Sequence, residues 1–242
     1  MTKKKIPSMN TESTIKTSYA GMMYSHDFRL WYTYLKRRIK KEWRPEELSF
    51  LLGKPDHAYL DFERMFQVEK FLMQESILLD RIYASSRLET MEFHRGEYEI
   101  SEERLVRFKI EEDEVKWIYS IEVPWTFLTE KKKHAAPKLK FEEWKAEKDL
   151  QLESDAMLHV RQKLDVLLDS NYFEHGATAL QMFRKVEHTG LVHLQIFPRH
   201  LKNVLYGLIQ QNKLVVRNIE NSFSFFLTDF QQANRKQHLL SI

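Results

Sequence analysis

Cysteine is absent from the 242-residue chain, and glycine and proline occur only 6 times each. Without cysteine the protein can form neither a disulfide nor a thiolate metal site, which suits the reducing cytoplasm. The scarcity of glycine and proline argues against a loop-rich all-β fold and favours helices. No stretch approaches the roughly 18 apolar residues of a membrane-spanning helix, and the lysine-rich start lacks the apolar segment of a secretory signal. We therefore expect a cytoplasmic protein with no membrane partner.

The signature motifs of common enzyme classes are also missing. The chain has no GxSxG nucleophile elbow, phosphate-binding loop, GxGxxG turn or HExxH zinc motif. Its 10 histidines are scattered, and the closest pair, His188 and His193, lacks both the i, i+4 helical spacing and a third ligand nearby. The acidic run of residues 111–114 is typical of a solvated turn. These absences predict a non-enzymatic protein that needs no metal or other cofactor.

Charge is unevenly distributed, although the net charge is only +3. Residues 1–64 contain 13 basic and 8 acidic side chains, residues 65–130 contain 8 and 15, residues 131–155 contain 7 and 6, and residues 156–242 contain 10 and 6. Basic ends suit contact with a polyanion, and an acidic middle suits contact with a protein or with water. Solvated faces with a chance asymmetry are an equally open interpretation.

Four regions are expected along the chain. Residues 1–24 are polar and rich in lysine, serine and threonine, which predicts a disordered arm. Residues 25–128 are predicted to form a helical bundle, with helices over 25–41, 45–52, 55–65 and 66–83, followed by an antiparallel β-hairpin over 105–110 and 115–123. Residues 129–155 are predicted to be a linker with a polar helix over 141–152. With a further domain over 156–242, the fold class is α+β, mainly α.

The segment from Trp43 to Arg64 has the pattern of two short helices joined by a tight turn. Pro45 suits the first turn of a helix, where its missing N–H costs nothing, and Gly53 can adopt a left-handed turn conformation. The segment resembles the lambda-repressor-like (Xre-type) helix-turn-helix family. The resemblance extends over residues 28–85, and its specific residues are Glu46-Glu47-Leu48, Ser49, Leu52-Gly53, Tyr59 and Phe62-Glu63.

This resemblance implies that the second helix of the pair lies in the major groove of DNA. The groove-facing positions would be Pro55, Asp56, His57, Leu60 and Asp61. The two acids would repel phosphate, although an acid can accept a hydrogen bond from cytosine. The side chains suited to DNA are Lys54, His57 and Arg64, and Lys54 stands where the family has an apolar residue. The alternative is a helix-turn-helix kept as a folding or protein-contact module.

The last segment is predicted to contain three helices and a two-stranded wing, which is the element order of a winged helix. We expect helices over 157–168, 179–186 and 198–211, and strands over 214–219 and 222–227 around a turn at Glu220-Asn221. Basic and amide groups at the start of the third helix can contact phosphates and base edges. These candidates are Arg199, His200, Lys202 and Asn203, joined by Lys213 and Arg217 on the wing. The alternatives are a winged helix that binds protein and a solvated polar face.

Two further features allow more than one interpretation. The basic run of residues 35–41, LKRRIKK, can bind phosphate non-specifically, or it can be an exposed helix end whose cations favour the negative end of the helix dipole; a nuclear localisation signal is a weaker reading. The chain also has 16 Phe, 10 Tyr and 5 Trp. Exposed rings can stack on unpaired bases, but Trp117 and Tyr119 lie on the strand face expected to pack into the core.

Together these patterns predict a non-enzymatic protein that binds double-stranded DNA, as a transcriptional regulator or as an accessory factor in replication or of a mobile element. Replacing Arg199 and Lys202 together is expected to weaken binding and to flatten its salt dependence. The alternative is a protein-interaction scaffold that uses degenerate helix-turn-helix and winged-helix modules, as Asp56, Asp61 and the acidic middle would suit. A reader of two-fold DNA sites is usually a dimer, so a homodimer is compatible with the sequence, although no heptad pattern marks an interface.

Overall fold

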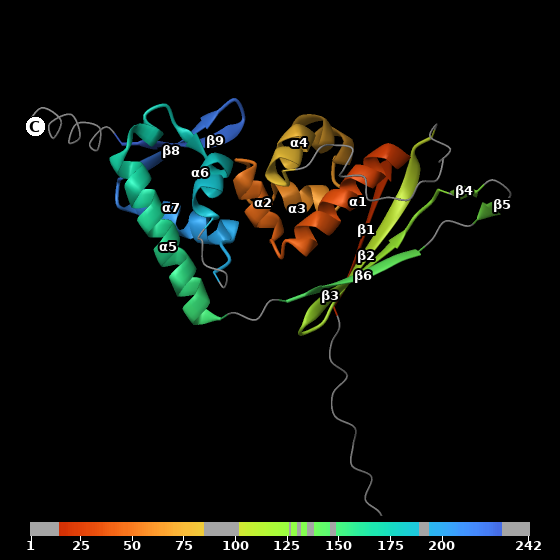
Figure 1. Ribbon diagram of the computed structural model, residues 1–242. Coiled ribbons are helices and arrows are strands. Elements are labelled where there is room, and N and C mark those ends of the chain that lie inside the picture. Colours follow the sequence, from red (N-terminus) through yellow and green to blue (C-terminus); the bar gives the residue numbers. More distant parts are fainter. Residues whose placement is uncertain are drawn as a thin grey trace, which may run out of the picture. The chain divides into compact units, whose positions relative to one another are not determined.

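The computed structural model describes residues 15–84, 102–125, 127–129, 132–134, 138–145, 149–188 and 194–228 (Figure 1). The protein is an α+β chain, as predicted, and it divides into two compact units. Unit 1 comprises Met1–Ser25 and Arg95–Ala146, and unit 2 comprises His26–His94 and Glu147–Ile242. The helical regions at the two ends of the chain, which were predicted as separate domains, thus belong to one unit. No helix in the described ranges is long and apolar enough to cross a membrane.

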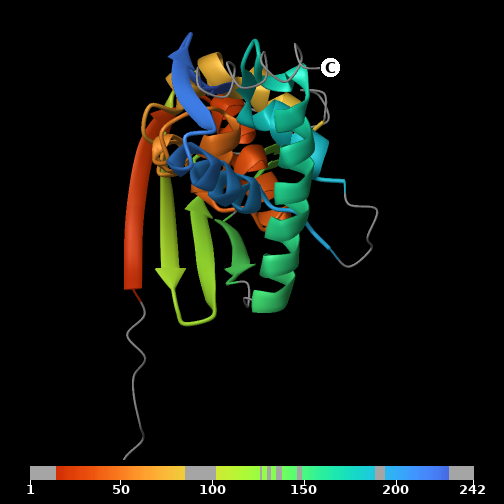
Figure 2. The same cartoon turned by 90° about the vertical axis from the view of Figure 1, so that its left-hand side faces the viewer.

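Unit 1 is built on a four-stranded antiparallel sheet with the strand order β1-β2-β3-β6 (Figure 2). Its strands are β1 (Ile15–Met23), β2 (Arg104–Glu112), β3 (Lys116–Glu122) and β6 (Lys138–Trp144). The predicted central hairpin is confirmed as β2 and β3. Two short strands, β4 (Phe127–Thr129) and β5 (Lys132–His134), form a separate antiparallel pair.

The two outer strands of this sheet correct two sequence predictions. Residues 15–23 are a strand and not part of a disordered arm, whereas residues 1–14 lie outside the described residues. Residues 138–144 are also a strand and not the end of a linker and the start of a polar helix. The apolar residues of 15–23 do not alternate regularly with polar ones, and the alternation in 138–144 is short and broken by two consecutive glutamates. Each segment is held by a partner strand that is distant in sequence or lies across a loop. Tertiary pairing therefore overrides local propensity here.

One face of the sheet is aromatic and buried. The ring of Phe108 stacks on that of Tyr119 at 5.7 Å between centroids, and Tyr119 stacks on Phe141 at 5.0 Å. Tyr19 continues the row from β1 at 6.2 Å from Phe108. These cross-strand pairs fix the register, because a slip of one residue would turn the rings to the opposite face. Tyr119 is thus a packing residue, as predicted.

The first part of unit 2 consists of four helices. They are α1 (Ser25–Lys40), α2 (Pro45–Leu51), α3 (Ala58–Glu63) and α4 (Val68–Ile82), close to the predicted ranges except that α3 is shorter. Trp31 of α1 is fully buried and donates its indole N–H to the carbonyl oxygen of Phe62 at 3.1 Å. Gly53 ends α2 with a φ of +68°, the left-handed conformation that the sequence predicts.

The second part of unit 2 has the predicted order of elements. It contains α5 (Leu150–Asp169), a 3-10 turn (Asn171–Phe173), β7 (Ala177–Thr178), α6 (Ala179–Val186), α7 (Pro198–Gln210), β8 (Leu214–Ile219) and β9 (Ser222–Leu227). The strands form a sheet in the order β7-β9-β8. Glu220 and Asn221, the turn of the hairpin, both have positive φ, which matches the twist of a tight hairpin turn. Helix α5 starts earlier than predicted because Asp149 caps it by accepting two backbone N–H groups.

Candidate functional site

The start of α7, where four of the nine predicted DNA contacts lie, is joined to α2 by a buried carboxylate. Glu47 is 1% exposed, and its two oxygens accept the backbone N–H of Arg44 at 2.6 Å and that of Arg199 at 2.9 Å. One side chain thus satisfies amide groups at the N-termini of two helices, where a negative charge also suits the helix dipoles. Burial raises the pKa of Glu47, and the two N–H donors and Arg199 partly oppose that rise.

Arg199 and His200 are occupied by Glu153 of α5. The Arg199 guanidinium donates to Glu153 at 2.5 Å and lies 3.6 Å from Glu47. The imidazole of His200 is 1% exposed; its Nε2 lies 3.0 Å from Glu153, and its Nδ1 accepts the backbone N–H of Phe197. The hydrogen bond from Arg199 lowers the pKa of Glu153. Burial lowers the pKa of His200, although Glu153 opposes that shift. Both predicted DNA ligands therefore take part in a partly buried polar network.

Two of the predicted lysines are also held by acids. Lys202 of α7 contacts the carboxylate of Asp56 at 2.6 Å, and Lys54 contacts Glu75 of α4 at 2.8 Å. The Lys202 side chain is 13% exposed, whereas that of Asp56 is 62% exposed. Asp56, which is expected from the sequence to repel phosphate, therefore has a basic partner within the protein.

The turn between α2 and α3 contacts the β8–β9 hairpin through a backbone hydrogen bond. The carbonyl oxygen of Gly53 accepts the backbone N–H of Phe223 at 2.8 Å. A Cβ atom at position 53 would lie 2.3 Å from Oγ of Ser222 and 2.9 Å from the backbone nitrogen of Phe223. Glycine is thus required for the close approach as well as for the positive φ.

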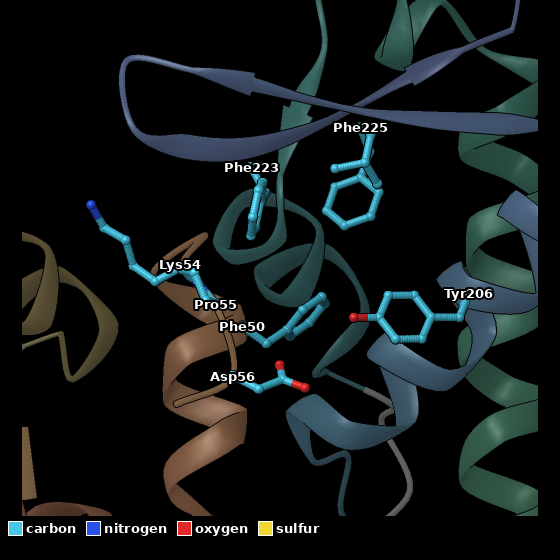
Figure 3. Close-up of a pocket in the computed structure, with 8 residues that line it drawn as sticks. Phe50, Lys54, Pro55, Asp56, Tyr206, Phe223 and Phe225 are labelled. Atoms are coloured by element: carbon cyan, nitrogen blue, oxygen red, sulfur yellow. The ribbon is translucent and has the colours of Figure 1, made fainter. Parts of the chain in front are cut away.

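A pocket of about 300 Å³ lies beside this contact (Figure 3). Figure 3 shows the rings of Phe50, Phe223, Phe225 and Tyr206 turned toward one space, with the carboxylate of Asp56 at its edge and Lys54 extending away. The rings of Phe50 and Phe225 meet edge to face at 6.3 Å. The pocket can take a small apolar or flat group, because aromatic rings line it and the one acid in its lining, Asp56, is paired with Lys202.

The remaining predicted ligands lie at the surface. His57, Arg64, Asn203 and Arg217 are exposed, and Lys213 is half-buried. The guanidinium of Arg217 lies over the ring of Phe226 at 5.1 Å, which positions it on β8 without neutralising it. His188 is exposed, and His193 lies outside the described residues, so their predicted lack of a shared metal remains a prediction.

Sequence reasoning missed three residues that organise unit 2. The sequence identifies Glu47 only as part of the family pattern. Its position three residues after Arg44 predicts that it caps α2, but nothing in the sequence predicts its contact with α7. Glu153 carried no signal. Arg38, taken as part of an exposed or phosphate-binding basic run, is 1% exposed; it pairs with Glu63 at 2.6 Å and donates to the carbonyl oxygen of Trp43.

Comparisons of the chain with protein families, with curated proteins and with solved structures found no match.

Proposed function

We propose that the protein binds duplex DNA without catalysing a reaction on it, and that unit 2 is a tandem of a helix-turn-helix and a winged helix. The observation that carries this proposal is the arrangement of the second part of unit 2. Three helices are followed by a hairpin whose second strand pairs with a short strand before α6, in the order β7-β9-β8. This order is similar to the plan of a winged helix, a fold used widely for DNA contact, and it supports the proposal by analogy.

The contact residues of this proposal differ from those that the sequence favoured. Arg199 and Lys202 are held by internal acids, so their proposed role is to join α7 to α5 and to the α2–α3 turn. The hairpin carries cations without a carboxylate partner in the described part of the chain, namely the exposed Arg217 and the half-buried Lys213. We assign the phosphate contact of unit 2 to these two side chains.

The test is fluorescence anisotropy of the protein with a random-sequence duplex, from low to physiological salt. Wild-type protein is expected to bind in a salt-sensitive manner. Replacing Lys213 and Arg217 with glutamine is expected to lower the slope of log affinity against log salt by up to about 2, since each phosphate contact contributes about 0.9. Glutamine at Lys70 and Lys163, exposed lysines on α4 and α5, removes the same charge and is the matched control.

Two results would count against this proposal. No binding of wild-type protein at low salt would remove DNA as the partner. Equal losses of DNA affinity in the two double variants would show that net charge, and not the hairpin, determines affinity. A variant of Arg199 and Lys202 is unsuited to this test, because the lost ion pairs would change folding as well as binding.

A second candidate, a protein-interaction scaffold, is favoured by one observation. The α2–α3 turn and the short helix α3 present acids, with Asp56 of the turn 62% exposed and Asp61 of α3 half-buried, and the aromatic pocket adjoins the turn. Stoichiometric co-purification with one protein after nuclease treatment, lost on replacing Tyr206 with alanine, would favour this candidate. Failure to bind DNA in the anisotropy experiment would favour it further.

A further inference from the structure

The second face of the unit 1 sheet is exposed and basic. We call it the outer face and define it by the residues opposite to the aromatic row. Residues directly opposite each other in antiparallel strands share a face, so the pairings Ser18–Lys109, Lys109–Ser120 and Ser120–Lys140 form one row across all four strands. The next row pairs Ala20, Arg107, Glu122 and Lys138 in the same order.

The charges of the outer face do not balance. Its three acids each have a basic partner: Glu111 pairs with Lys16 at 3.2 Å, Glu122 with Arg107 at 3.8 Å and Glu142 with Lys116 at 2.8 Å. Three further lysines, Lys109, Lys138 and Lys140, are exposed and have no ion pair with any residue in the described ranges. The outer face therefore carries three uncompensated positive charges, although residues 65–130, which include β2 and β3, are strongly acidic.

These three lysines lie close together. Lys138 and Lys140 are two residues apart on β6, which places their backbones about 7 Å apart, and Lys109 and Lys140 are separated by one strand, or about 10 Å. Such distances fall within a Debye length of about 8 to 10 Å, so the like charges repel one another in the free protein. A polyanion would relieve this repulsion.

The shape of the outer face suits an extended anion. Ser120 is small and lies between Lys109 and Lys140, and Ser18 and Ala20 on the edge strand β1 are small as well, so the large side chains within these two rows are the charged ones. Duplex DNA presents one negative charge per about 1.7 Å of its axis, so several phosphates can lie within reach of flexible lysine side chains at once. The serine hydroxyls offer additional donors to phosphate oxygens.

We propose that the outer face, through Lys109, Lys138 and Lys140, is a second contact of this protein with duplex DNA and binds its phosphate backbone without reading sequence. This proposal rests on the proposed function of unit 2 and adds a separate surface to it. Binding through this surface strengthens attachment uniformly across sequences, because phosphates carry no base identity.

The experiment compares wild-type full-length protein with two triple variants in the anisotropy assay. In the first, Lys109, Lys138 and Lys140 are replaced by glutamine. We expect this variant to lose affinity on the order of tenfold or more at low salt and its salt slope to fall by about 2 to 3, equally on duplexes of unrelated sequence. In the second, the same lysines are replaced by arginine, and binding is expected to stay near the wild-type level because the charge is kept.

A footprint gives an independent readout on unaltered protein. Lysine acetylation, followed by mass spectrometry with and without duplex DNA, is expected to show protection of these three lysines and no change at Lys163. The circular dichroism spectra of the variants check that the sheet is retained; because the lysines are exposed, no loss of fold is expected.

The outcomes separate the two proposals. If wild-type protein binds and the glutamine variant binds equally well with an unchanged slope, the outer face is not a DNA contact, while the proposed function of unit 2 stands. Acetylation of the three lysines that is unaffected by DNA would also overturn the inference. If wild-type protein fails to bind at low salt, both proposals fail together.

Discussion

At the scale of single residues, the most informative side chain is a buried carboxylate that joins two helices of unit 2. Glu47 lies in the first turn of α2 and accepts hydrogen bonds from backbone amides at the start of two helices. One of these amides, that of Arg199, is 152 positions away in the sequence. A carboxylate buried to this degree is tolerated only because hydrogen bonds satisfy it. It joins the first and second parts of unit 2 by a polar contact.

Replacing Glu47 with alanine is expected to lower the free energy of unfolding by about 3 kcal/mol. The change removes two hydrogen bonds to a charged acceptor and leaves Arg199 without one of its acids in a buried site. Urea unfolding followed by circular dichroism measures the loss. The control is Glu46→Ala, since the neighbouring side chain is 45% exposed and makes a 3.9 Å ion pair with Arg44; its effect is expected to stay below about 1 kcal/mol. Equal effects of the two substitutions would contradict the bridging role.

His200 is expected to make stability depend on pH. Its pKa in the folded protein is lowered by burial, with Glu153 opposing and Arg199 assisting the shift. A lowered pKa means that the stabilisation is present above the unfolded value of about 6.5 and is lost as pH falls through the lower folded value. The free energy of unfolding should therefore rise as the pH increases from the lowered folded pKa through the unfolded value of about 6.5.

His200→Gln isolates this contribution. Glutamine can still accept the N–H of Phe197 as a capping-box residue, but it does not titrate, so the variant is expected to show a shallower rise of stability with pH. Urea unfolding at a series of pH values measures both slopes. His159, whose pKa burial also lowers, is present in both proteins and cancels in the difference. Identical slopes would mean that His200 does not contribute.

At the scale of elements, the α2–α3 turn determines how the β8–β9 hairpin docks. Gly53→Ala is expected to destabilise unit 2 by at least about 2 kcal/mol, because the left-handed backbone alone costs an L-residue about 1–2 kcal/mol and the added Cβ meets Ser222 and Phe223. The chain offers a matched control in Gly207 on α7, where a Cβ meets nothing within 4 Å. Gly207→Ala is expected to stabilise by about 0.5–1 kcal/mol. Thermal or urea unfolding of both variants checks the opposite signs.

The elements also show how far local pattern predicts structure. Helices α1, α4, α6 and α7 and the β8–β9 hairpin lie within a few residues of their predicted ranges, because apolar periodicity, caps and turn residues mark them locally. The strands β1 and β6 were missed. Their residues carry weak alternation, and their structure comes from pairing with β2 and β3.

At the scale of the whole molecule, the two helical regions of unit 2 are joined by contacts spread over several elements. Besides Glu47 and Gly53, the ring of Trp43 meets that of Phe183 edge to face at 5.8 Å. Because polar, backbone and aromatic contacts all cross between α1–α4 and α5–β9, we expect the two regions to unfold as one cooperative part.

Hydrogen exchange followed by mass spectrometry measures this cooperativity. In wild-type protein, amides of α2 and α7 are expected to exchange with similar protection, and Glu47→Ala should lower protection in both regions together. Reduced protection confined to α2 and its neighbours would show that the two regions open independently.

The sequence by itself determined most of the helices, the β2–β3 and β8–β9 hairpins and the left-handed glycine, because these depend on residues within a few positions of one another. It also determined which side chains could bind an anion. Only the tertiary structure decided which of those cations remain available. Arg199, His200 and Lys202 are paired with acids that lie far away in the chain, whereas Lys109, Lys138 and Lys140 are gathered on one face by strand register. The physical reason is that an ion pair or a charged patch depends on distance in space, and folding brings these residues together without any mark in the local sequence.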